Sequence, residues 1–228
     1  MYKVNYLGHS GFTVETDNYF LVFDYVYKNK DVTLGVLDEI EQKQISIKNI
    51  GKTVIFFNSH DHFDHYNRDI NNLYSKYNNA YTILGDISVN FANTKIMKNR
   101  EVLEVKGVKV CTAKATDAGV CFLVNVDGII IYFAGDNIDW GDEASKKLYY
   151  SEIDYLSSLA GHVDLAFIPV CNFYGEQSKS ILDSAIYAIE KFNATETYPM
   201  HSPFGKFLYA NFDKILKDRN IKTKVIIL

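Results

Sequence analysis

The strongest chemical signal in this chain is a cluster of metal-binding residue types within six consecutive positions. His60, His62 and His65 are interspersed with Asp61 and Asp64. Neutral imidazole and carboxylate groups suit zinc, iron or manganese, and catalytic zinc sites combine such donors with an open water position. Side chains two residues apart at a strand exit can point the same way. His60 and His62 are therefore expected to share one ion, while Asp64 and His65 serve a second.

A solvated polar loop is the ordinary alternative for such a cluster. Residues 53–58, directly before it, form a hydrophobic run that is typical of a buried strand. Four ligand groups at the end of a buried strand would be partly desolvated, which costs free energy unless a cation compensates for it. The sequence therefore favours a metal site, with Asp61 as a solvated neighbour.

Asp136 and His201 are further candidates because each follows an apolar strand. Residues 129–134 lead through a glycine to Asp136, and residues 195–200 lead directly to His201. Taken alone, Gly135-Asp136 is typical of a turn, and His201 of a surface histidine. Because the histidine cluster lies in the same chain, both side chains are expected to be ligands.

The elements that must position these side chains are predicted from hydrophobic periodicity. Strands are expected at residues 2–7, 12–16, 19–24, 53–58, 81–84, 102–105, 108–113, 120–126, 129–134, 164–170, 195–200 and 222–228. Helices are expected at residues 66–77, 142–160, 178–192 and 206–219. Residues 31–51, with a short helix over 37–44, are interpreted as a loop or lid insertion. This order predicts an α/β fold, sheets with helices outside them, in a single domain over residues 1–228.

Two segments of the chain repeat one pattern. Residues 11–24 and residues 119–136 each read as a hairpin that ends in an aspartate, Asp24 in the first and Asp136 in the second. The second hairpin turns at Asp127-Gly128, a sequence typical of a type I′ turn. Two similar halves that each deliver an acid to a strand end are consistent with a site between two sheets.

Composition excludes several classes of protein. With 228 residues, 47% of them hydrophobic and 23% charged, the chain can bury a core and is not disordered. A net charge of −4 provides no general attraction for nucleic acid or an anionic membrane. No apolar run approaches the roughly 18 residues of a membrane span, and no signal-peptide core is evident. The three cysteines include no Cys-x-x-Cys pair. We expect a cytoplasmic protein that acts on a small molecule.

The motif His60-x-His62-x-Asp64-His65 resembles the signature of the metallo-β-lactamase fold superfamily. Other segments occur in the order expected of its lactonase-like hydrolases, a group that includes L-ascorbate-6-phosphate lactonase. These segments are Leu7-Gly8-His9-Ser10-Gly11-Phe12, Phe23-Asp24, Phe133-Ala134-Gly135-Asp136 and Pro199-Met200-His201. The resemblance implies a four-layer αββα sandwich, two packed mixed sheets with outer helices, and a metal site between the sheets.

The resemblance also implies a set of ligands. His60 and His62 would serve one metal, Asp64, His65 and His201 would serve the other, and Asp136 would bridge them. One or two Zn²⁺ ions are expected, with Mn²⁺ or Fe²⁺ as alternatives. His9 and Asp24 are expected to support the ligands and not to bind metal themselves.

The sequence departs from the superfamily at one position. A further histidine normally completes the first metal site just before the second hairpin, but residues 111–119 contain none, and the position falls at or near Lys114. Asp117 could substitute as an oxygen ligand, or only the second site could be strongly occupied. A Lys114 ammonium facing the site could replace the missing cation or bind a substrate anion. Lys114 pointing to solvent is the third alternative.

The expected function is metal-dependent hydrolysis of an ester, lactone or phosphoester, in which Asp64 orients the attacking water or takes its proton. An RNA or phosphodiester nuclease of the same fold is the first alternative, although the acidic chain has no basic arm. The second is a binding or regulatory protein that retains metal without turnover, which the missing histidine would explain.

Overall fold

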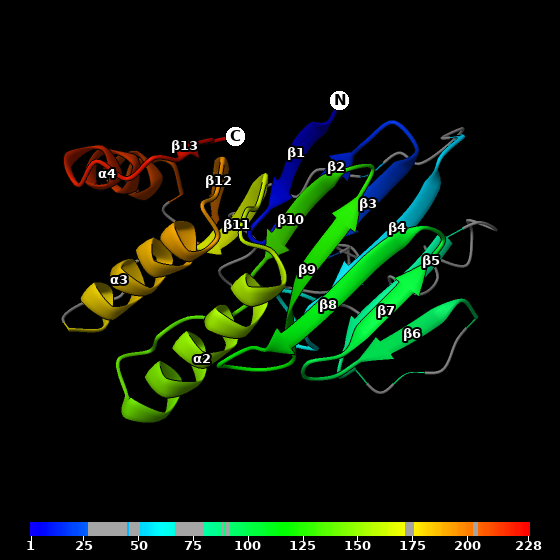
Figure 1. The fold of residues 1–228 in the computed structure, drawn as a ribbon, viewed down its shortest axis with the longest axis horizontal. Helices are drawn as coiled ribbons and strands as arrows, with labels where there is room; N and C mark the ends of the chain where they lie inside the picture. The colour runs from blue at the N-terminus through cyan, green and yellow to red at the C-terminus, as the bar shows by residue number, and fades with distance from the viewer. Residues whose placement is uncertain are drawn as a thin grey trace.

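Two β-sheets form the centre of the molecule (Figure 1). The computed structural model describes residues 1–26, 45, 51–66, 80–87, 89, 92–171, 176–202 and 205–228. Within these residues, the first sheet contains β1 (Lys3–Gly8), β2 (Gly11–Glu15), β3 (Tyr19–Phe23), β4 (Thr53–Asn58), β5 (Ala80–Gly85) and β6 (Thr94–Met97). The second contains β7 (Val102–Val105), β8 (Val108–Lys114), β9 (Val120–Val126), β10 (Ile129–Phe133), β11 (Leu165–Pro169), β12 (Glu196–Met200) and β13 (Lys224–Val225).

Both sheets are mixed and follow the same plan. In the first, β1 to β3 pair antiparallel and β3 to β6 pair parallel. In the second, β7 to β10 pair antiparallel and β10 to β13 pair parallel. The carboxyl ends of parallel neighbours meet at one edge of a sheet, which is where open α/β sheets bind ligands. The repeated pattern in the sequence therefore corresponds to two equivalent hairpins, β2–β3 and β9–β10.

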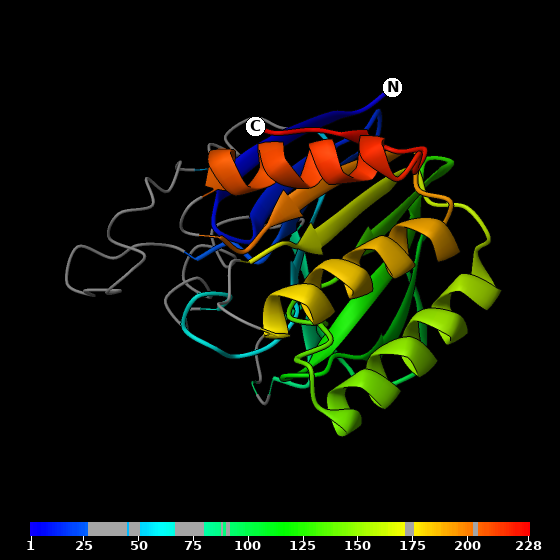
Figure 2. The ribbon, with the colours of Figure 1, turned by 90° about the vertical axis from the view of Figure 1, so that its left-hand side faces the viewer.

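Three helices cover the outer face of the second sheet (Figures 1 and 2). They are α2 (Glu143–Leu159), α3 (Glu176–Lys191) and α4 (Gly205–Asp218). α2 begins where Asp142 accepts hydrogen bonds from the backbone N–H groups of Ala144 and Ser145, each at 2.9 Å. This side chain satisfies two amides that would otherwise lack partners at the helix start.

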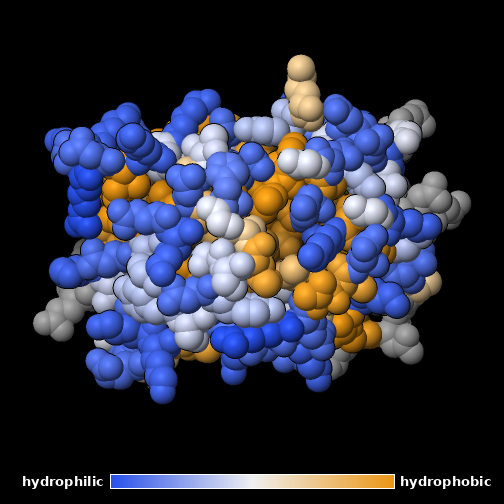
Figure 3. Space-filling model, viewed as in Figure 1, coloured by the Kyte–Doolittle hydropathy of each residue, from blue (hydrophilic) through white to orange (hydrophobic). Residues whose placement is uncertain are grey.

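Hydrophobic residues gather in the middle of the face seen in Figure 3, with hydrophilic residues around them.

A stack of aromatic rings joins the two sheets beneath the strand ends. Phe23 of β3 stacks on Phe57 of β4, with ring centroids 4.7 Å apart, and on Phe133 of β10 at 4.8 Å. All three rings are buried. Each belongs to a strand whose exit carries a candidate site residue, because Asp24, His60 and Asp136 follow within three residues. Packing of these rings therefore fixes the distance between the two halves of the site.

The predicted strands at 53–58, 102–105 and 120–126 coincide with β4, β7 and β9. One prediction was wrong, because the last strand, expected over 222–228, is only Lys224–Val225, and one strand, β6, was not predicted. β6 is a four-residue edge strand with two exposed residues, so it lacks the alternation of a half-buried strand. The predicted helix at 66–77 and insertion at 31–51 lie outside the described residues, except for Ile45, Gly51 and Tyr66. No described helix is long and apolar enough to cross a membrane.

Candidate metal centre

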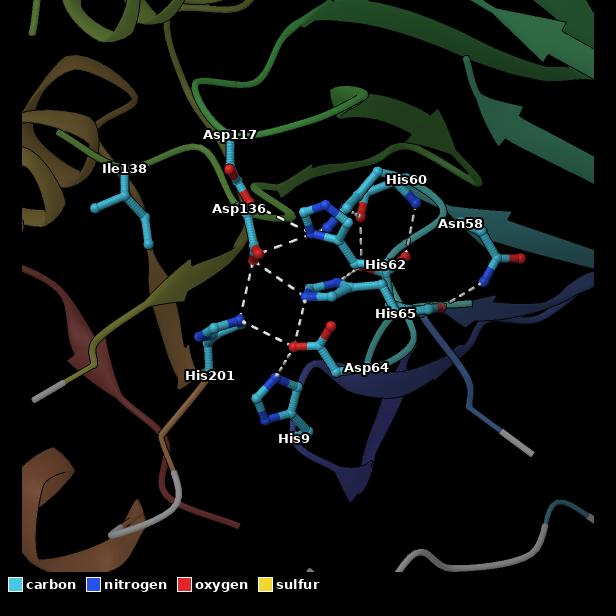
Figure 4. A network of polar contacts seen from close by, with 12 residues as sticks. His9, Asn58, His60, His62, Asp64, His65, Asp117, Asp136, Ile138 and His201 are labelled. Carbon is cyan, nitrogen blue, oxygen red and sulfur yellow. Dashed lines mark hydrogen bonds and ion pairs between the residues drawn. The ribbon is translucent and has the colours of Figure 1, made fainter. Parts of the chain in front are cut away.

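Six predicted ligands converge where the exits of β4, β10 and β12 meet (Figure 4). The loop after β4 carries four of them, and β10 and β12 deliver one each. The six residues are His60, His62, Asp64, His65, Asp136 and His201. Two additional side chains, His9 after β1 and Asp117 between β8 and β9, join them. Together they form two groups, and within each group the candidate ligand atoms lie within 4.8 Å of one another.

The first group consists of His60, His62, Asp117 and Asp136. His60 Nε2 lies 3.6 Å from Asp136 Oδ2, and His62 Nδ1 lies 3.3 Å from Asp117 Oδ2. His60 and Asp136 are buried, whereas the side chains of His62 and Asp117 are close to half exposed. This group is open to solvent on one side, as a site that admits a substrate must be.

The second group consists of His9, Asp64, His65 and His201. Asp64 Oδ2 lies 3.7 Å from His65 Nε2, 3.7 Å from His201 Nε2 and 3.1 Å from His9 Nε2. Asp136 reaches this group as well, because its Oδ1 lies 3.2 Å from both His65 Nε2 and His201 Nε2. Asp136 thus faces one group with each carboxylate oxygen, which is the arrangement of a bridging carboxylate.

Among the described residues, several donor atoms at the centre lack hydrogen-bond partners. In the described part of the chain, no hydrogen bond satisfies the buried atoms His60 Nε2, His65 Nε2, His201 Nε2 and Asp136 Oδ1. A buried polar atom without a partner costs about 1–3 kcal/mol, and charged groups cost more. Four such atoms directed at one another are what a metal cation would satisfy. The residues present therefore fit a metal centre.

The electrostatics of the cluster agree with this fit. Burial lowers the pKa of His65, but Asp136 and Asp24 outweigh it and raise that pKa to about 10. Burial and the neighbouring His65 lower the pKa of His60 to about 4. Burial opposes ionisation of Asp136, yet His65 and His201 hold its pKa well below the ordinary value. The Asp136 carboxylate is therefore ionised at neutral pH, ready to bind a cation.

Asp24, predicted to be structural, fixes the orientation of a central histidine. Its Oδ2 lies 2.7 Å from His65 Nδ1 and accepts a 2.6 Å hydrogen bond from Ser59 Oγ, while its Oδ1 accepts a 2.7 Å bond from the Ser59 amide. With Nδ1–H donating to Asp24, His65 Nε2 carries a lone pair toward the cluster. The two equivalent hairpins thus end in Asp24 and Asp136, which contact opposite nitrogens of one imidazole.

Backbone strain concentrates around the site. His9, Asp24 and His201 all have positive φ angles, of 50°, 39° and 65°. Non-glycine residues adopt this region at a cost, and such residues cluster at functional sites. Gly119 also has a positive φ, of 62°, and a Cβ atom there would overlap the Ser59 carbonyl oxygen. The glycine lets the β8–β9 loop approach the histidine loop closely enough to bring Asp117 to His62.

Sequence reasoning missed Thr116, which couples two of the acids. Its Oγ1 lies 3.2 Å from the Asp136 carbonyl oxygen and 2.6 Å from that of Ile138, and it accepts a 2.8 Å bond from the Ile138 amide. Thr116 directly precedes Asp117. One hydroxyl therefore ties the Asp117 loop to the loop after Asp136. A threonine beside a candidate ligand was the only signal, and threonines are too common in loops to indicate this role.

Asp117 and Lys114, the two residues considered for the position of the missing histidine, lie in different surroundings. Asp117 lies in the first group, 3.3 Å from His62. Lys114 ends β8 with an exposed side chain, and its amide donates to Asn99 Oδ1 at 2.9 Å. Of the two, Asp117 is therefore placed to substitute for the histidine. His9 was expected only to support the ligands and does contact Asp64, but its Nε2 also lies within the second group.

Comparison with known proteins agrees with the fold. A family model described as a beta-lactamase superfamily domain matches residues 3–201. The chain is 25% identical to a UPF0173 metal-dependent hydrolase of Korarchaeum cryptofilum and 24% identical to one of Thermococcus onnurineus, over 100% of this chain and 96% of each relative. Igni18, a metallo hydrolase of Ignicoccus hospitalis, superposes with a TM-score of 0.69 at 17% identity, over 100% of this chain and 94% of that one. The two mixed sheets with outer helices are the metallo-β-lactamase fold, and this chain belongs to the metallo-β-lactamase superfamily.

Proposed function

We propose that this protein is a metal-dependent hydrolase that cleaves an ester, lactone or phosphoester bond. One observation carries the proposal: two groups of imidazole and carboxylate donors adjoin Asp136, and four buried atoms at their centre have no hydrogen-bond partner among the described residues. A structural metal would be satisfied by a closed set of four ligands. The exposed side chains of His62 and Asp117 leave one side of this centre open instead.

When bound there, a divalent metal supplies Lewis acidity and lowers the pKa of a water molecule that it coordinates. His60, His62, Asp117 and Asp136 would hold one ion, and Asp64, His65, Asp136 and His201 the other. Burial opposes ionisation of Asp64, but the neighbouring imidazoles of His201 and His9 lower its pKa below the ordinary value. Such a carboxylate is a weak base. We therefore assign Asp64 the task of orienting the attacking water through a hydrogen bond to its oxygens.

Zinc is the metal that we propose for this centre. Both groups combine imidazole with carboxylate and contain no thiolate, a mixture typical of catalytic zinc sites. The same donors also suit Fe²⁺ and Mn²⁺, so metal analysis of protein produced without added metal is part of the test. A lactonase-like substrate is supported by the order of the Leu7–Phe12, Phe133–Asp136 and Pro199–His201 segments. A binding protein without turnover is less well supported, because Asp117 lies where the histidine is missing.

The test compares metal content and turnover in single variants. His65→Ala and His201→Ala should each lose metal and all hydrolysis of lactones, thioesters and phosphodiesters. His162→Ala is the matched control, because His162 is a partly exposed histidine whose Nδ1 lies 3.0 Å from the Asn193 carbonyl oxygen, away from the cluster. Unchanged metal content in either site variant would refute the ligand set. A fully loaded protein that is inactive on all three substrate classes would refute the hydrolase proposal.

The number of ions tests Asp117 separately. Two ions per chain are expected in the natural protein, and Asp117→Ala should reduce the content to about one. The variant should keep the second ion because Asp117 lies in the first group alone. Two tightly held ions in the Asp117→Ala protein would show that Asp117 is not a ligand.

A further inference from the structure

A pocket of about 390 Å³ opens beside the first group of ligands. It is lined by the loop after β8, the segment before α2 and the first turns of α2, through the residues Thr116, Asp117, Trp140, Asp142, Ala144, Ser145 and Leu148. Asp117 belongs to both the pocket and the metal centre. The pocket therefore adjoins the first group of ligands through Asp117.

The hydroxyl groups of the pocket are already engaged by the protein. Thr116 Oγ1 is bonded within its loop, at 2.6 Å to the Ile138 carbonyl oxygen and 2.8 Å from the Ile138 amide. Ser145 Oγ accepts from the Trp140 amide and donates to the Asp142 carbonyl oxygen, each at 3.1 Å. Neither hydroxyl has a free proton for an anionic ligand. Because Asp117 is assigned to the first metal ion, the polar side chain left for recognition is the carboxylate of Asp142.

The charge of the pocket is negative. None of the described lining residues is basic, and within the described chain neither Asp117 nor Asp142 is paired with lysine or arginine. Backbone hydrogen bonds, that from Ser145 first, lower the pKa of Asp142, so it is ionised at neutral pH. The start of a helix ordinarily attracts anions. Here Asp142 itself accepts from the amides of Ala144 and Ser145, and an incoming anion would have to displace it.

The lining of the pocket also includes apolar side chains. Trp140 is half-buried and packs against Ile138, Cys171 and Ile181, while Leu148 is half-buried in α2. Tryptophan is the aromatic side chain that attracts cations most strongly, and a cation between an indole and carboxylates gains from both. Ammonium groups with apolar substituents match this combination, since their charge is diffuse and their surface is hydrophobic.

We propose that this pocket binds a cationic group of the substrate, an amine or quaternary ammonium attached to the acyl or leaving group, and that it discriminates against anionic substrates. The proposal names the substrate class of the proposed hydrolase and rests on that function. Trp140 supplies the hydrophobic wall, and Asp142 supplies the charge.

Binding can be measured without turnover because Trp140 is the only tryptophan in the chain. Its fluorescence is followed in the zinc-loaded protein during titration with three small ligands: benzyltrimethylammonium, benzyl alcohol and phenylmethanesulfonate. These share an aromatic ring and carry a positive, zero or negative charge. We expect the cation to bind at least threefold more tightly than the alcohol, and the sulfonate most weakly, with the preference shrinking as salt is added. Equal affinities, or tighter binding of the sulfonate, would overturn the proposal.

Asp142→Asn tests the charge while keeping the helix start, because asparagine caps helices as well as aspartate does. The variant should bind benzyltrimethylammonium about three- to tenfold more weakly and phenylmethanesulfonate more tightly. Asp154→Asn is the matched control, since Asp154 lies on α2 far from the pocket lining and pairs with Lys191 at 2.7 Å. An identical change in both variants would reduce the effect to net charge and refute a local role for Asp142.

Turnover separates failure of this proposal from failure of the hydrolase proposal. Acetylthiocholine and 3,3-dimethylbutyl thioacetate have nearly the same shape and differ by one positive charge. A cation-selective hydrolase should show the higher kcat/KM for acetylthiocholine, and Asp142→Asn should reduce that ratio. Hydrolysis of both thioesters at equal rates would refute cation selectivity alone. Fluorescence selectivity for the cation without hydrolysis of any ester would refute the hydrolase assignment and retain the cationic pocket.

Discussion

Asp24→Asn should weaken metal binding through His65 while leaving the backbone in place. Asp24 has a φ of 39°, and asparagine is among the few residues that tolerate this region, so the change removes charge without adding strain. The side chain accepts three hydrogen bonds, from the Ser59 amide, Ser59 Oγ and His65 Nδ1. An asparagine can supply one oxygen and must present an NH₂ group at the other position.

The geometry decides which position becomes the NH₂ group. The Ser59 amide can only donate, so the asparagine oxygen is expected opposite it, at the place of Asp24 Oδ1. The NH₂ group then faces Ser59 Oγ, which can reverse its role, and His65 Nδ1, which must become an acceptor. The imidazole proton would move to Nε2, the atom that faces Asp136. A protonated nitrogen cannot bind metal.

The expected loss is about 10- to 100-fold in metal affinity, or about 1.4–2.7 kcal/mol, which is typical when the partner of a metal-binding histidine is removed. The alternative orientation would leave the buried Ser59 amide unpaired, at a cost of about 1–3 kcal/mol in the free energy of unfolding. Competition with a chromophoric chelator measures the first quantity, and urea unfolding of the chelated protein measures the second.

A matched control uses another aspartate beside a histidine. Asp164 accepts a 2.8 Å bond from the Ile130 amide and lies 3.5 Å from His162 Nε2, outside the metal centre. Asp164→Asn should leave metal affinity unchanged. If Asp24→Asn binds metal as tightly as the natural protein and is equally stable, Asp24 does not set the tautomer of His65, and the reasoning fails.

Four further predictions follow from contacts around the site. Metal affinity should rise with pH from 6 to 8, by about tenfold per pH unit for each proton displaced. The reason is that the pKa of His65 is raised to about 10, so its proton must leave before a metal binds. An affinity that does not change with pH, measured by chelator competition, would contradict this. In the chelated protein, that raised pKa contributes stability that is present below about pH 6.5 and is lost as pH rises toward 10, which urea unfolding across this range would show. Thr116→Val should lower the affinity of the first ion about tenfold by isotope-dilution analysis, whereas Thr116→Ser should restore it. Gly119→Ala should lower the free energy of unfolding in urea by about 2–4 kcal/mol, because its φ is 62° and the added methyl group meets the Ser59 carbonyl. Gly128→Ala is the control: its φ is 76° but the space around it is open, so this variant measures the cost of the backbone angle without the steric overlap.

Much of the candidate site could be predicted because its signals are local. The donors of residues 60–65 are consecutive, and the strand before them is a hydrophobic run that needs no partner to be recognised. Asp136 and His201 were identified because each follows a strand of the same kind, and both lie in the cluster. Strand β6 was missed because a short edge strand carries little periodic pattern. The predictions for residues 31–51 and 67–77 remain predictions almost throughout.

Tertiary structure decided the parts that depend on residues far apart in the sequence. The choice between Lys114 and Asp117 was open until the β8–β9 loop was placed against His62. Asp24 and His65 are 41 residues apart, and their contact exists because β3 and β4 pair in parallel and end at the same edge. The sequence by itself determined which side chains could bind a metal and which strands carry them. Which of their atoms meet was determined only by the packing of the two sheets against shared aromatic rings. Strand pairing and ring stacking depend on residues far away in the sequence, and the local hydrophobic pattern does not specify them.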